Sequence, residues 1–354
     1  MSDSITSLSL DFLLPGDPQT LTGGYIYDRR ILDGLSALGW TVRVRTLNAS
    51  FPFPTAAALD HASATLEGIA PGGVVVIDGL ALGAMPELIE RHAARLRLVA
   101  VIHHPLSRET GLGTQDREAL EQSERRALSH VDRVIVTSQW TMRRLADDGV
   151  PAERIRVVMP GTDPAPLAQG STETPLKLLC VATLTPRKGH AVLFDALAQL
   201  LNRPWHLDCI GSLSRDIATA EALQRQITRS RLTRRVNLVG EVTPEALEGY
   251  YASADLFVLA SYLEGYGMAH AEALAHGLPM VTTSAGAVSE TVPANAALFV
   301  PPGDRGALAR ALATVLDDSA VRENLAHGAR LARETLPTWT QASALFDAEL
   351  KAFL

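Results

Sequence analysis

The sequence predicts an α/β protein with two doubly wound domains that face each other across a cleft. Three observations favour this fold class. The chain of 354 residues is longer than one ordinary α/β domain requires. Short apolar runs alternate with longer amphipathic stretches in both halves, which is typical of parallel sheets covered by helices. Between the halves, residues 160–175 are rich in proline, glycine and small polar residues, which indicates an interdomain linker.

The predicted strands are apolar runs that have the length of a buried parallel strand. In the first half they are residues 8–14, 42–47, 74–77, 98–102, 134–136 and 155–159. In the second half they are residues 178–181, 206–210, 236–239, 256–259 and 279–283. The stretches between them have helical spacing and start signals, such as Pro244 at the first position of an expected helix.

These elements divide the chain into two Rossmann-like domains, at residues 1–165 and 166–335. A last helix, residues 336–354, is expected to begin near Trp339 and to return to the N-terminal domain. Ligands of such sheets bind beyond the carboxyl ends of the strands, where helices begin. The loops that follow the predicted strands are therefore where chemistry is expected.

Composition excludes several classes of protein. The net charge of −7 argues against a nucleic-acid backbone binder. No signal peptide is expected, and no apolar run reaches the roughly 20 residues that span a membrane. The cytoplasm is therefore the expected compartment, with peripheral contact to the inner face of the membrane left open. The two cysteines, Cys180 and Cys209, are too few for a disulfide framework, and their spacing argues against zinc, so buried reduced thiols are expected.

The most informative stretch is residues 261–279, which follows a predicted strand. Gly265 and Gly267 allow a ligand to approach the backbone closely, and a helix is expected to begin near Met268. The first amides of that helix would form an anion site suited to phosphate. Glu264 and Glu272 flank the helix start, and carboxylates accept strong hydrogen bonds from sugar hydroxyls. The alternative is a strand–loop–helix whose glutamates are simply solvated.

Two adjacent cations, Arg187 and Lys188, follow the first predicted strand of the second domain. A pair of cations at a strand-to-helix turn suits a diphosphate and would stabilise charge on a leaving phosphate. The chain has only three lysines, so Lys188 does not belong to a lysine-rich face. The alternative is a solvated surface pair.

Two features of the first domain are weaker signals. His103 and His104 end a predicted strand, where an imidazole could donate to a sugar hydroxyl or shuttle a proton, or could serve only local hydrogen bonding. Gly23 and Gly24 follow the first strand and precede a helix, and they allow a bound group to approach the backbone. No strand-end Asp-x-Asp occurs, which favours charge stabilisation without a metal ion.

Together these motifs resemble family 4 of the glycosyltransferases, which are retaining enzymes of the GT-B fold. The resemblance extends over nearly the whole chain and is most specific in residues 240–304. Glu264 and Glu272 reproduce the family's pair of glutamates separated by seven residues. The matching segments that follow are Ala-His-Gly-Leu-Pro-Met-Val at 275–281, Ala-Gly-Ala-Val-Ser-Glu at 285–290 and Val-Pro-Pro-Gly-Asp at 300–304.

The resemblance implies a role for each candidate. Arg187 and Lys188 would clamp the diphosphate, Glu264 would hold hydroxyls of the donor sugar and Glu272 would hold the ribose. His103 would lie beside the donor sugar, with His104 the weaker match. The other donor-binding residues that the resemblance implies are Gly23 and Gly24 near the reaction centre, Gly211, Val242 near the base, Gly265, Tyr266 and Gly267, and the phosphate-binding amides around Met268, Ala269 and His270.

Two departures from the family pattern bear on the donor. Many members have Gly-Arg-Leu before the Lys-Gly pair, whereas this chain has Ala182-Thr183-Leu184, so the clamp would depend on Arg187. The segment 285–287 lacks the glycine pair that is common there.

The resemblance implies transfer of a hexosyl group from a nucleoside-diphosphate sugar to a hydroxyl acceptor, with retention of anomeric configuration. The second domain would bind the donor and the first the acceptor, which could be a glycan, a lipid-linked glycan or a small molecule. No cofactor, metal ion or nucleic acid is expected. The alternatives are a sugar-nucleotide epimerase of the same fold, an inactive sugar-nucleotide-binding partner subunit, and a phosphorylase, for whose cofactor-bearing lysine the chain has no candidate.

Overall fold

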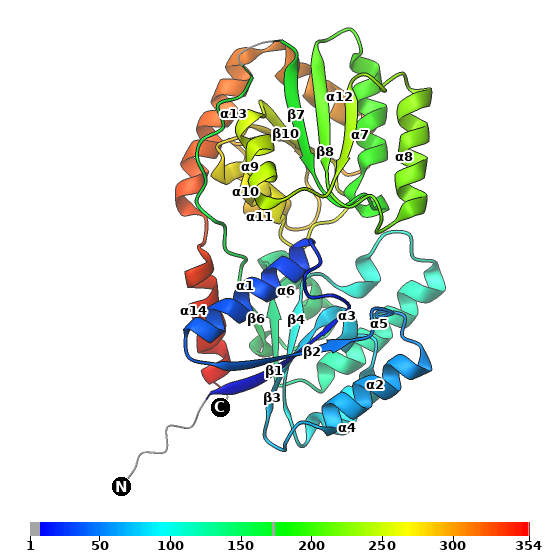
Figure 1. Ribbon diagram of the computed structural model, residues 1–354, viewed down its shortest axis with the longest axis vertical. Helices are drawn as coiled ribbons and strands as arrows, with labels where there is room; N and C mark the ends of the chain where they lie inside the picture. Colours follow the sequence, from blue (N-terminus) through cyan, green and yellow to red (C-terminus); the bar gives the residue numbers. More distant parts are fainter. Residues whose placement is uncertain (1–7, 172–173, 353) are drawn as a thin grey trace. The chain divides into compact units, whose positions relative to one another are not determined.

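The computed structural model describes residues 8–171, 174–352 and 354. The chain forms two compact units, one made of Met1–Gly161 with Pro337–Leu354 and the other of Thr162–Leu336 (Figure 1). Each unit contains one six-stranded parallel sheet with helices around it. The predicted fold class, two doubly wound α/β domains, is confirmed at the level of each unit.

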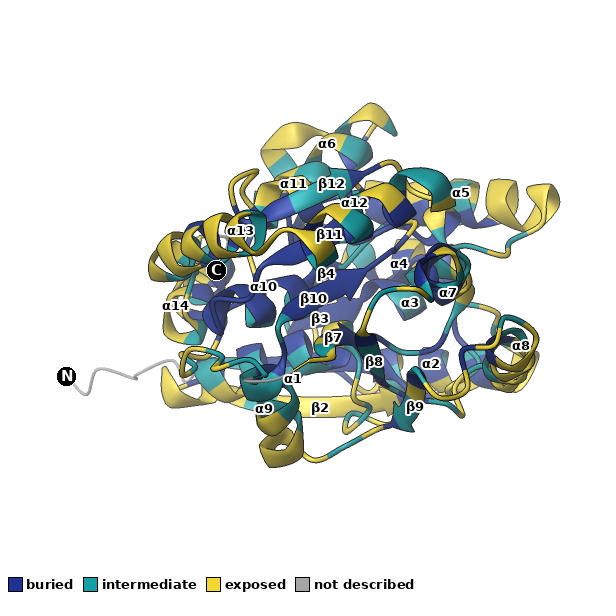
Figure 2. Ribbon diagram, turned by 90° about the horizontal axis from the view of Figure 1, so that it is seen from above, coloured by how far each residue is buried: buried dark blue, intermediate teal, exposed yellow. Residues whose placement is uncertain are grey.

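The sheet of the first unit has the strand order β2-β1-β3-β4-β5-β6. The central strands β3 and β4 are buried because their apolar runs are covered on both faces. The edge strand β2 is mostly exposed (Figure 2), and its Arg43 and Arg45 pair with the buried Asp11 of β1 at 2.8 Å each. The strands are β1 Ser9–Pro15, β2 Thr41–Leu47, β3 Val74–Asp78, β4 Arg97–Ile102, β5 Arg133–Val136 and β6 Ile155–Val157.

The helices of this unit begin at the residues that the sequence favours for caps. Thr55, Asp78 and Ser138 each accept a hydrogen bond from a backbone amide of the helix that they start. The helices are α1 Gly23–Ala37, α2 Ala56–Glu67, α3 Gly79–Leu82, α4 Pro86–Ala93, α5 Thr114–Ser129, α6 Gln139–Asp147 and α14 Trp339–Lys351, with the 3-10 turns η1 Leu106–Arg108 and η2 Ala152–Arg154.

The C-terminal helix α14 lies against α1. Thr338 caps it with a capping box, and Trp40 donates from Nε1 to Asp347 at 2.7 Å. A Cβ added at Gly34 would lie 1.9 Å from Ser343 Oγ, so the two helices approach closely at a glycine. Residues 337–354 therefore complete the first unit.

The sheet of the second unit has the order β12-β11-β10-β7-β8-β9. Five of its strands match predicted runs, whereas the edge strand β12 was not predicted, although its sequence Ala-Leu-Phe-Val is a short apolar run just before Pro301. The strands are β7 Leu176–Val181, β8 Trp205–Ile210, β9 Val236–Gly240, β10 Leu256–Leu259, β11 Met280–Thr283 and β12 Ala297–Val300.

The helices of the second unit cover both faces of this sheet. Pro244 stands at the first position of α9, as predicted, with Thr243 as the cap. The helices are α7 His190–Leu197, α8 Ile217–Arg229, α9 Pro244–Ser253, α10 Met268–Ala275, α11 Val288–Thr291, α12 Arg305–Asp317 and α13 Ser319–Ala332, with η3 Pro186–Lys188, η4 Ala198–Leu200 and η5 Arg333–Thr335. In the described part of the chain, no helix combines the length and apolar character that crossing a bilayer requires.

Much of the predicted linker packs along the second unit. Ala168 and Gln169 donate backbone hydrogen bonds to His276 and Ala252, at 2.8 and 2.9 Å, and Ser171 donates to Asp255. The change of unit falls between Gly161 and Thr162. Proline and glycine thus mark a segment without regular structure that is nevertheless held in place.

Each sheet reverses its winding direction at one point. In the first unit β1 has β2 on one side and β3 on the other, and in the second unit β7 lies between β8 and β10. Ligands of doubly wound sheets bind at the carboxyl ends of strands beside such a switch point. The loops after β1, β3, β7 and β10 are therefore the positions to inspect.

Candidate active site

In the second unit, the loop after β7 reaches the end of the neighbouring strand β10. Gly189 has φ of +68°, and a Cβ there would lie 1.9 Å from the carbonyl oxygen of Ala260. Only glycine permits this backbone conformation at so close an approach. The two cations that precede Gly189 are thereby carried to the residues that follow β10.

These cations meet Glu264. Lys188 Nζ lies 2.7 and 3.0 Å from the two carboxylate oxygens of Glu264, and Ser261 Oγ donates to the same carboxylate at 2.6 Å. Arg187 Nη1 lies 3.9 Å from Glu264 and donates to the carbonyl of Leu263 at 3.0 Å. Three residues predicted from separate motifs thus form one cluster at the β7/β10 switch point.

Glu264 is a buried carboxylate. Burial raises its pKa, but the charges of Lys188 and Arg187 outweigh burial and bring the pKa to about 2. The residue is 5% exposed, and the side chains of Lys188 and Arg187 are 17% and 18% exposed. Neither the glutamate nor the cations are solvated surface groups, so that alternative does not hold here.

The helix α10 begins beside this cluster. Its cap residue, Gly267, has φ of +96° and supplies no side chain to cap the helix. The amides of His270 and Ala271 donate to the Gly267 carbonyl at 2.9 and 3.1 Å. The first amides, those of Met268 and Ala269, have no partner available within a helix and can bind an anion.

The His270 side chain belongs to the core and does not line the site. It is fully buried, its Nε2 lies 2.8 Å from Thr282 Oγ1, and its ring packs edge-on against Phe257. Burial lowers its pKa to about 4, so the imidazole is neutral. The amide of His270 donates within the turn. The predicted amides that remain to bind phosphate are therefore those of Met268 and Ala269.

Glu272 lies one turn into α10 and has a different environment. Tyr251 donates its hydroxyl to Glu272 at 2.8 Å. Burial raises the pKa of Glu272 to about 7, against the lowering effect of the Tyr251 hydrogen bond. Unlike Glu264, Glu272 has no cation among the described residues that lowers its pKa.

The other predicted residues of the second unit lie in loops at the same edge of the sheet. Gly211 has φ of +146°, and a Cβ there would lie 2.2 Å from the Ala182 carbonyl, so it lets the ends of β7 and β8 meet. Val242 follows β9 and is half-buried, as is Gly265, whereas Tyr266 is buried. A Cβ at Gly286 would lie 2.2 Å from the carbonyl oxygen of Glu264. This second glycine contact holds the Glu264 loop against the segment before α11.

In the first unit, His103 stands between two buried carboxylates that sequence reasoning missed. Its Nε2 lies 3.3 Å from Asp28 Oδ1 and 3.4 Å from Asp78 Oδ2. Burial lowers the pKa of His103, but the two carboxylates outweigh it and raise the pKa to about 10. Asp78 ends β3, which is a recognisable position at a carboxyl end, whereas nothing in the sequence marks Asp28 within α1.

Gly23 and Gly24 form the first turn of α1 and do not precede it, contrary to the prediction. The first amides of a helix need no partner within it, so glycine is tolerated there. A Cβ at Gly24 would lie 3.0 Å from His103 Cδ2, and Tyr27 packs edge-on against the imidazole at 5.4 Å. Gly24 thus admits the histidine ring beside the helix start.

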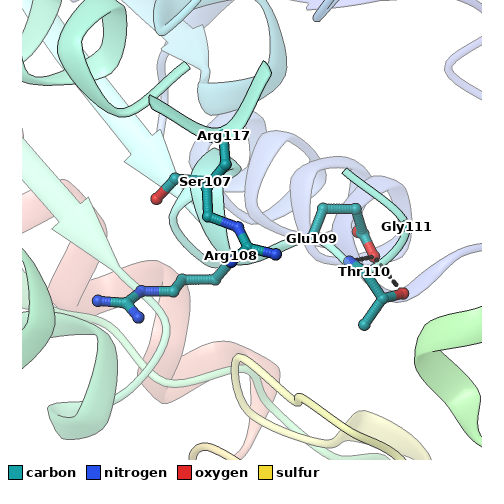
Figure 3. A pocket seen from close by; sticks show the side chains of 6 residues that line it. All are labelled: Ser107, Arg108, Glu109, Thr110, Gly111 and Arg117. Carbon is teal, nitrogen blue, oxygen red and sulfur yellow. Dashed lines mark hydrogen bonds between the residues drawn. The ribbon is translucent and has the colours of Figure 1, made fainter. Parts of the chain in front are cut away.

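The adjacent His104 has a separate environment. Its Nε2 lies 3.3 Å from Glu109, beside a pocket of about 280 Å³. Figure 3 shows the side chains that line this pocket, which are those of Ser107, Arg108, Glu109, Thr110 and Arg117, together with Gly111. Two arginines make the pocket suitable for an anionic group, and the sequence motifs did not point to it.

The two cysteines are free and buried, as predicted, but the spacing argument did not foresee their neighbour. Cys180 and Cys209 lie opposite each other on β7 and β8, and His190 Nε2 lies 3.7 Å from Cys180 Sγ. These three residues offer ligand atoms within 4.8 Å of one another. Among the described residues, Nδ1 of His190 has no hydrogen-bond partner, whereas the second ring nitrogen of a metal-bound histidine usually donates a hydrogen bond.

Comparison with known proteins gives the family. Residues 52–161 match the glycosyl transferase 4-like domain, and residues 166–332 match the glycosyl transferases group 1 domain. A D-inositol 3-phosphate glycosyltransferase from Corynebacterium efficiens is 31% identical over 230 residues, which are 59% of this chain and 54% of that protein. The match thus spans about half the length of this curated relative.

Two solved structures share the fold. A sucrose-phosphate synthase from Thermosynechococcus elongatus superposes with a TM-score of 0.83 and 23% identity, over 98% of this chain and 99% of that one. HepE from Anabaena in complex with UDP-glucose gives a TM-score of 0.76 and 19% identity, over 98% and 100%. The chain therefore has the GT-B fold and belongs to the glycosyl transferases group 1 family, with a glycosyl transferase 4-like domain before the group 1 domain.

Proposed function

We propose that the chain transfers a hexosyl group from a nucleoside-diphosphate sugar to a hydroxyl acceptor, with retention of configuration and without a metal ion. The observation that carries this proposal is the cluster of Lys188, Arg187 and Glu264 beside the uncapped start of α10. It combines two cations and free amides for a diphosphate with a charged carboxylate for hydroxyl groups. The Anabaena relative binds UDP-glucose, which supports a sugar nucleotide as donor.

In this proposal the second unit binds the donor. Lys188, Arg187 and the amides of Met268 and Ala269 hold the diphosphate, and Glu272 accepts hydrogen bonds from the ribose. Glu264 holds Lys188 in place and uses its remaining acceptor capacity for a sugar hydroxyl, since a carboxylate has about four acceptor positions. The base lies near Gly211 and Val242, and Gly265 and Tyr266 complete the sugar loop.

The first unit supplies His103 and binds the acceptor. The acceptor hydroxyl forms a bond to the anomeric carbon on the face from which the diphosphate leaves. The bond from that carbon to the phosphate oxygen breaks, and the acceptor proton passes to the leaving diphosphate. The protein contributes positioning and charge stabilisation, which account for most of the catalysis in such transfers.

The test uses the purified chain with uridine and guanosine diphosphate sugars, screened first by thermal shift. A donor at 100 times its dissociation constant should stabilise the fold by about 2.7 kcal/mol. The best donor is then incubated with hydroxyl acceptors, and NMR of the product gives the anomeric configuration. Inversion would refute the retaining mechanism, and donor binding without transfer to any acceptor would favour an inactive binding subunit.

A further inference from the structure

The His103 imidazole lies beside two buried carboxylates, and when protonated it supplies a positive charge next to both. Asp28 projects from α1 and Asp78 from the end of β3, and their side chains are 2% and 6% exposed. Neither carboxylate oxygen of Asp28 has a hydrogen-bond partner among the described residues. The other charged groups of α1 nearby are engaged elsewhere, since Arg29 donates to backbone carbonyls and Arg30 lies over Trp339.

The protonation state of this cluster follows from the cost of burying charge. A neutral imidazole would leave two carboxylates buried without a counter-charge, and uncompensated buried charge is strongly unfavourable. A protonated imidazole compensates one of them, because its Nε2 lies 3.3 Å from Asp28 and 3.4 Å from Asp78. The raised pKa of His103, at about 10, agrees with this electrostatic argument.

The other ring nitrogen of His103, Nδ1, is then the one that can contact a ligand. In the described structure Nδ1 of His103 makes no hydrogen bond, and one fifth of the side chain remains exposed, against 2% for Asp28. The ring is held on its other sides by Gly24 and Tyr27. A charged imidazole whose Nε2 faces the two carboxylates can offer Nδ1–H to a ligand.

We propose that Asp28 and Asp78 hold His103 as a permanently charged hydrogen-bond donor, whose Nδ1–H binds a substrate oxygen and never accepts the acceptor's proton. This inference rests on the proposed function for the identity of the substrate, and it settles the choice between donation and proton shuttling for this histidine. Asp28 and Asp78 are positioning residues, which touch His103 and not the substrate. The acceptor proton therefore leaves with the diphosphate.

The direct test is NMR titration of the purified full chain with ¹⁵N-labelled histidine. The signal of His103, one of ten histidines, is identified by its loss in His103→Gln. Between about pH 6 and about pH 9, where an ordinary histidine titrates near 6.5, the His103 ring should stay doubly protonated. Asp28→Asn and Asp78→Asn should each bring its titration into that range. Titration near the ordinary value in the unmodified protein, or a neutral ring throughout, would overturn the proposal.

The kinetic arm separates a positioning role from a merely structural one. Asp28→Asn should lower kcat by on the order of 10-fold to 100-fold, and its rate should fall further as pH rises through the lowered pKa of His103. Asp33→Asn, at an exposed aspartate of the same helix, is the matched control and should change neither kcat nor its dependence on pH. A flat pH profile in Asp28→Asn would contradict the proposal, as would a change of the His103 signal on adding EDTA, which would indicate a bound cation.

Failure of this inference can be distinguished from failure of the proposed function. If the chain transfers no sugar, the titration of the unmodified protein still decides the state of His103. If transfer occurs while His103 titrates as an ordinary histidine, only this inference is lost. The wild-type titration needs only His103→Gln, for assignment of the signal, so a poorly folding Asp28→Asn protein does not prevent the decision.

Discussion

The charge of Lys188 is already compensated by Glu264 in the free protein, and this pairing changes what a substitution at either residue should do. Removing one partner of a buried pair leaves the other as an uncompensated buried charge. Effects on stability and on catalysis are therefore mixed in each single variant. They can be separated by combining the two substitutions.

Lys188→Ala should lower turnover by on the order of 100-fold or more, because the cation acts on charge developing in the leaving diphosphate. It should also destabilise the fold by about 1–3 kcal/mol, because Glu264 loses its counter-charge. The double variant with Glu264→Gln should recover much of this stability but none of the activity, as measured by urea unfolding and steady-state kinetics. Lys177→Ala, at an exposed lysine of β7, is the control. Near-normal turnover in Lys188→Ala would remove Lys188 from the diphosphate site.

The two glutamates should differ in their effects on the free nucleotide. Glu272→Gln weakens the hydrogen bonds that this side chain accepts from ribose hydroxyls. It should therefore reduce binding of both the nucleoside diphosphate and its sugar conjugate. Glu264→Gln removes the partner that competes for Lys188, so the free nucleotide should bind at least as well while turnover of the donor falls. Calorimetric titration of both variants, with the exposed Glu323→Gln as control, measures the difference. Equal weakening by both substitutions would show that this division of roles is wrong.

The carboxyl group of Glu272 should make donor binding depend on pH. Its pKa is raised to about 7 by burial, and ribose hydroxyls donate to its ionised form. Nucleotide affinity should therefore increase as pH rises through 7, by up to about 10-fold between pH 6 and pH 8. Glu272→Gln should remove this dependence and leave only the smaller effect of the nucleotide's own phosphate. An identical pH profile in the variant would exclude Glu272 as the titrating group.

At the scale of elements, two loops depend on glycine to reach one another. Gly189 lets the turn η3 lie on the end of β10, and Gly286 lets the segment before α11 lie on the Glu264 loop. Both have positive φ, so a side chain would be strained even without the close carbonyl contacts. The position of the Lys188–Glu264 pair is thus set by backbone contacts between elements and not by the ion pair alone.

Gly189→Ala should test this dependence. The strained φ and the clash with the Ala260 carbonyl should cost about 1–3 kcal/mol of stability and displace Lys188 from Glu264, with a large loss of donor affinity. Gly249→Ala is the control and should stabilise the protein. Gly249 lies in α9, a new Cβ there meets no atom within 4 Å, and alanine favours a helix over glycine by up to about 1 kcal/mol. Chemical unfolding measures the stability of both variants, and titration with the donor measures their donor affinity. Unchanged donor affinity in a folded Gly189→Ala protein would separate the turn from the site.

At the scale of the whole chain, both sheets place charged residues at the carboxyl ends of their strands. The second unit brings Lys188, Arg187 and Glu264 to the ends of β7 and β10. The first brings Asp78 and His103 to the ends of β3 and β4, beside the start of α1. The groups that we assign to the diphosphate are cations and amides, which need no bridging metal ion.

Activity should therefore survive exhaustive treatment with EDTA. The rate is measured before and after chelation, and again after addition of magnesium or manganese, with thermal unfolding as a check that the fold is intact. Complete loss in chelator that either ion restores would count against metal-independent transfer. An undiminished rate would agree with charge stabilisation by Lys188, Arg187 and the α10 amides.

The sequence by itself determined the architecture of each unit. Buried parallel strands need continuous apolar runs, and helices need spaced apolar positions with capping residues, so eleven of the twelve strands appear in the one-dimensional pattern. The edge strand β12 was missed although all four of its residues are apolar. The sequence also predicted Arg187, Lys188, Glu264 and Glu272 as candidate site residues, because glycines and charges after a strand mark the carboxyl edge of a sheet.

Only the tertiary structure decided which of these groups meet. The pairing of Lys188 with Glu264 joins residues 76 positions apart, and Asp28, Asp78 and His103 come from three different elements. His270 shows the reverse case, since its amide was expected to bind phosphate, whereas that amide donates to the Gly267 carbonyl and the ring belongs to the core. Motifs report local order along the chain, but charge compensation, pKa values and burial depend on distances that exist only after the sheets have formed.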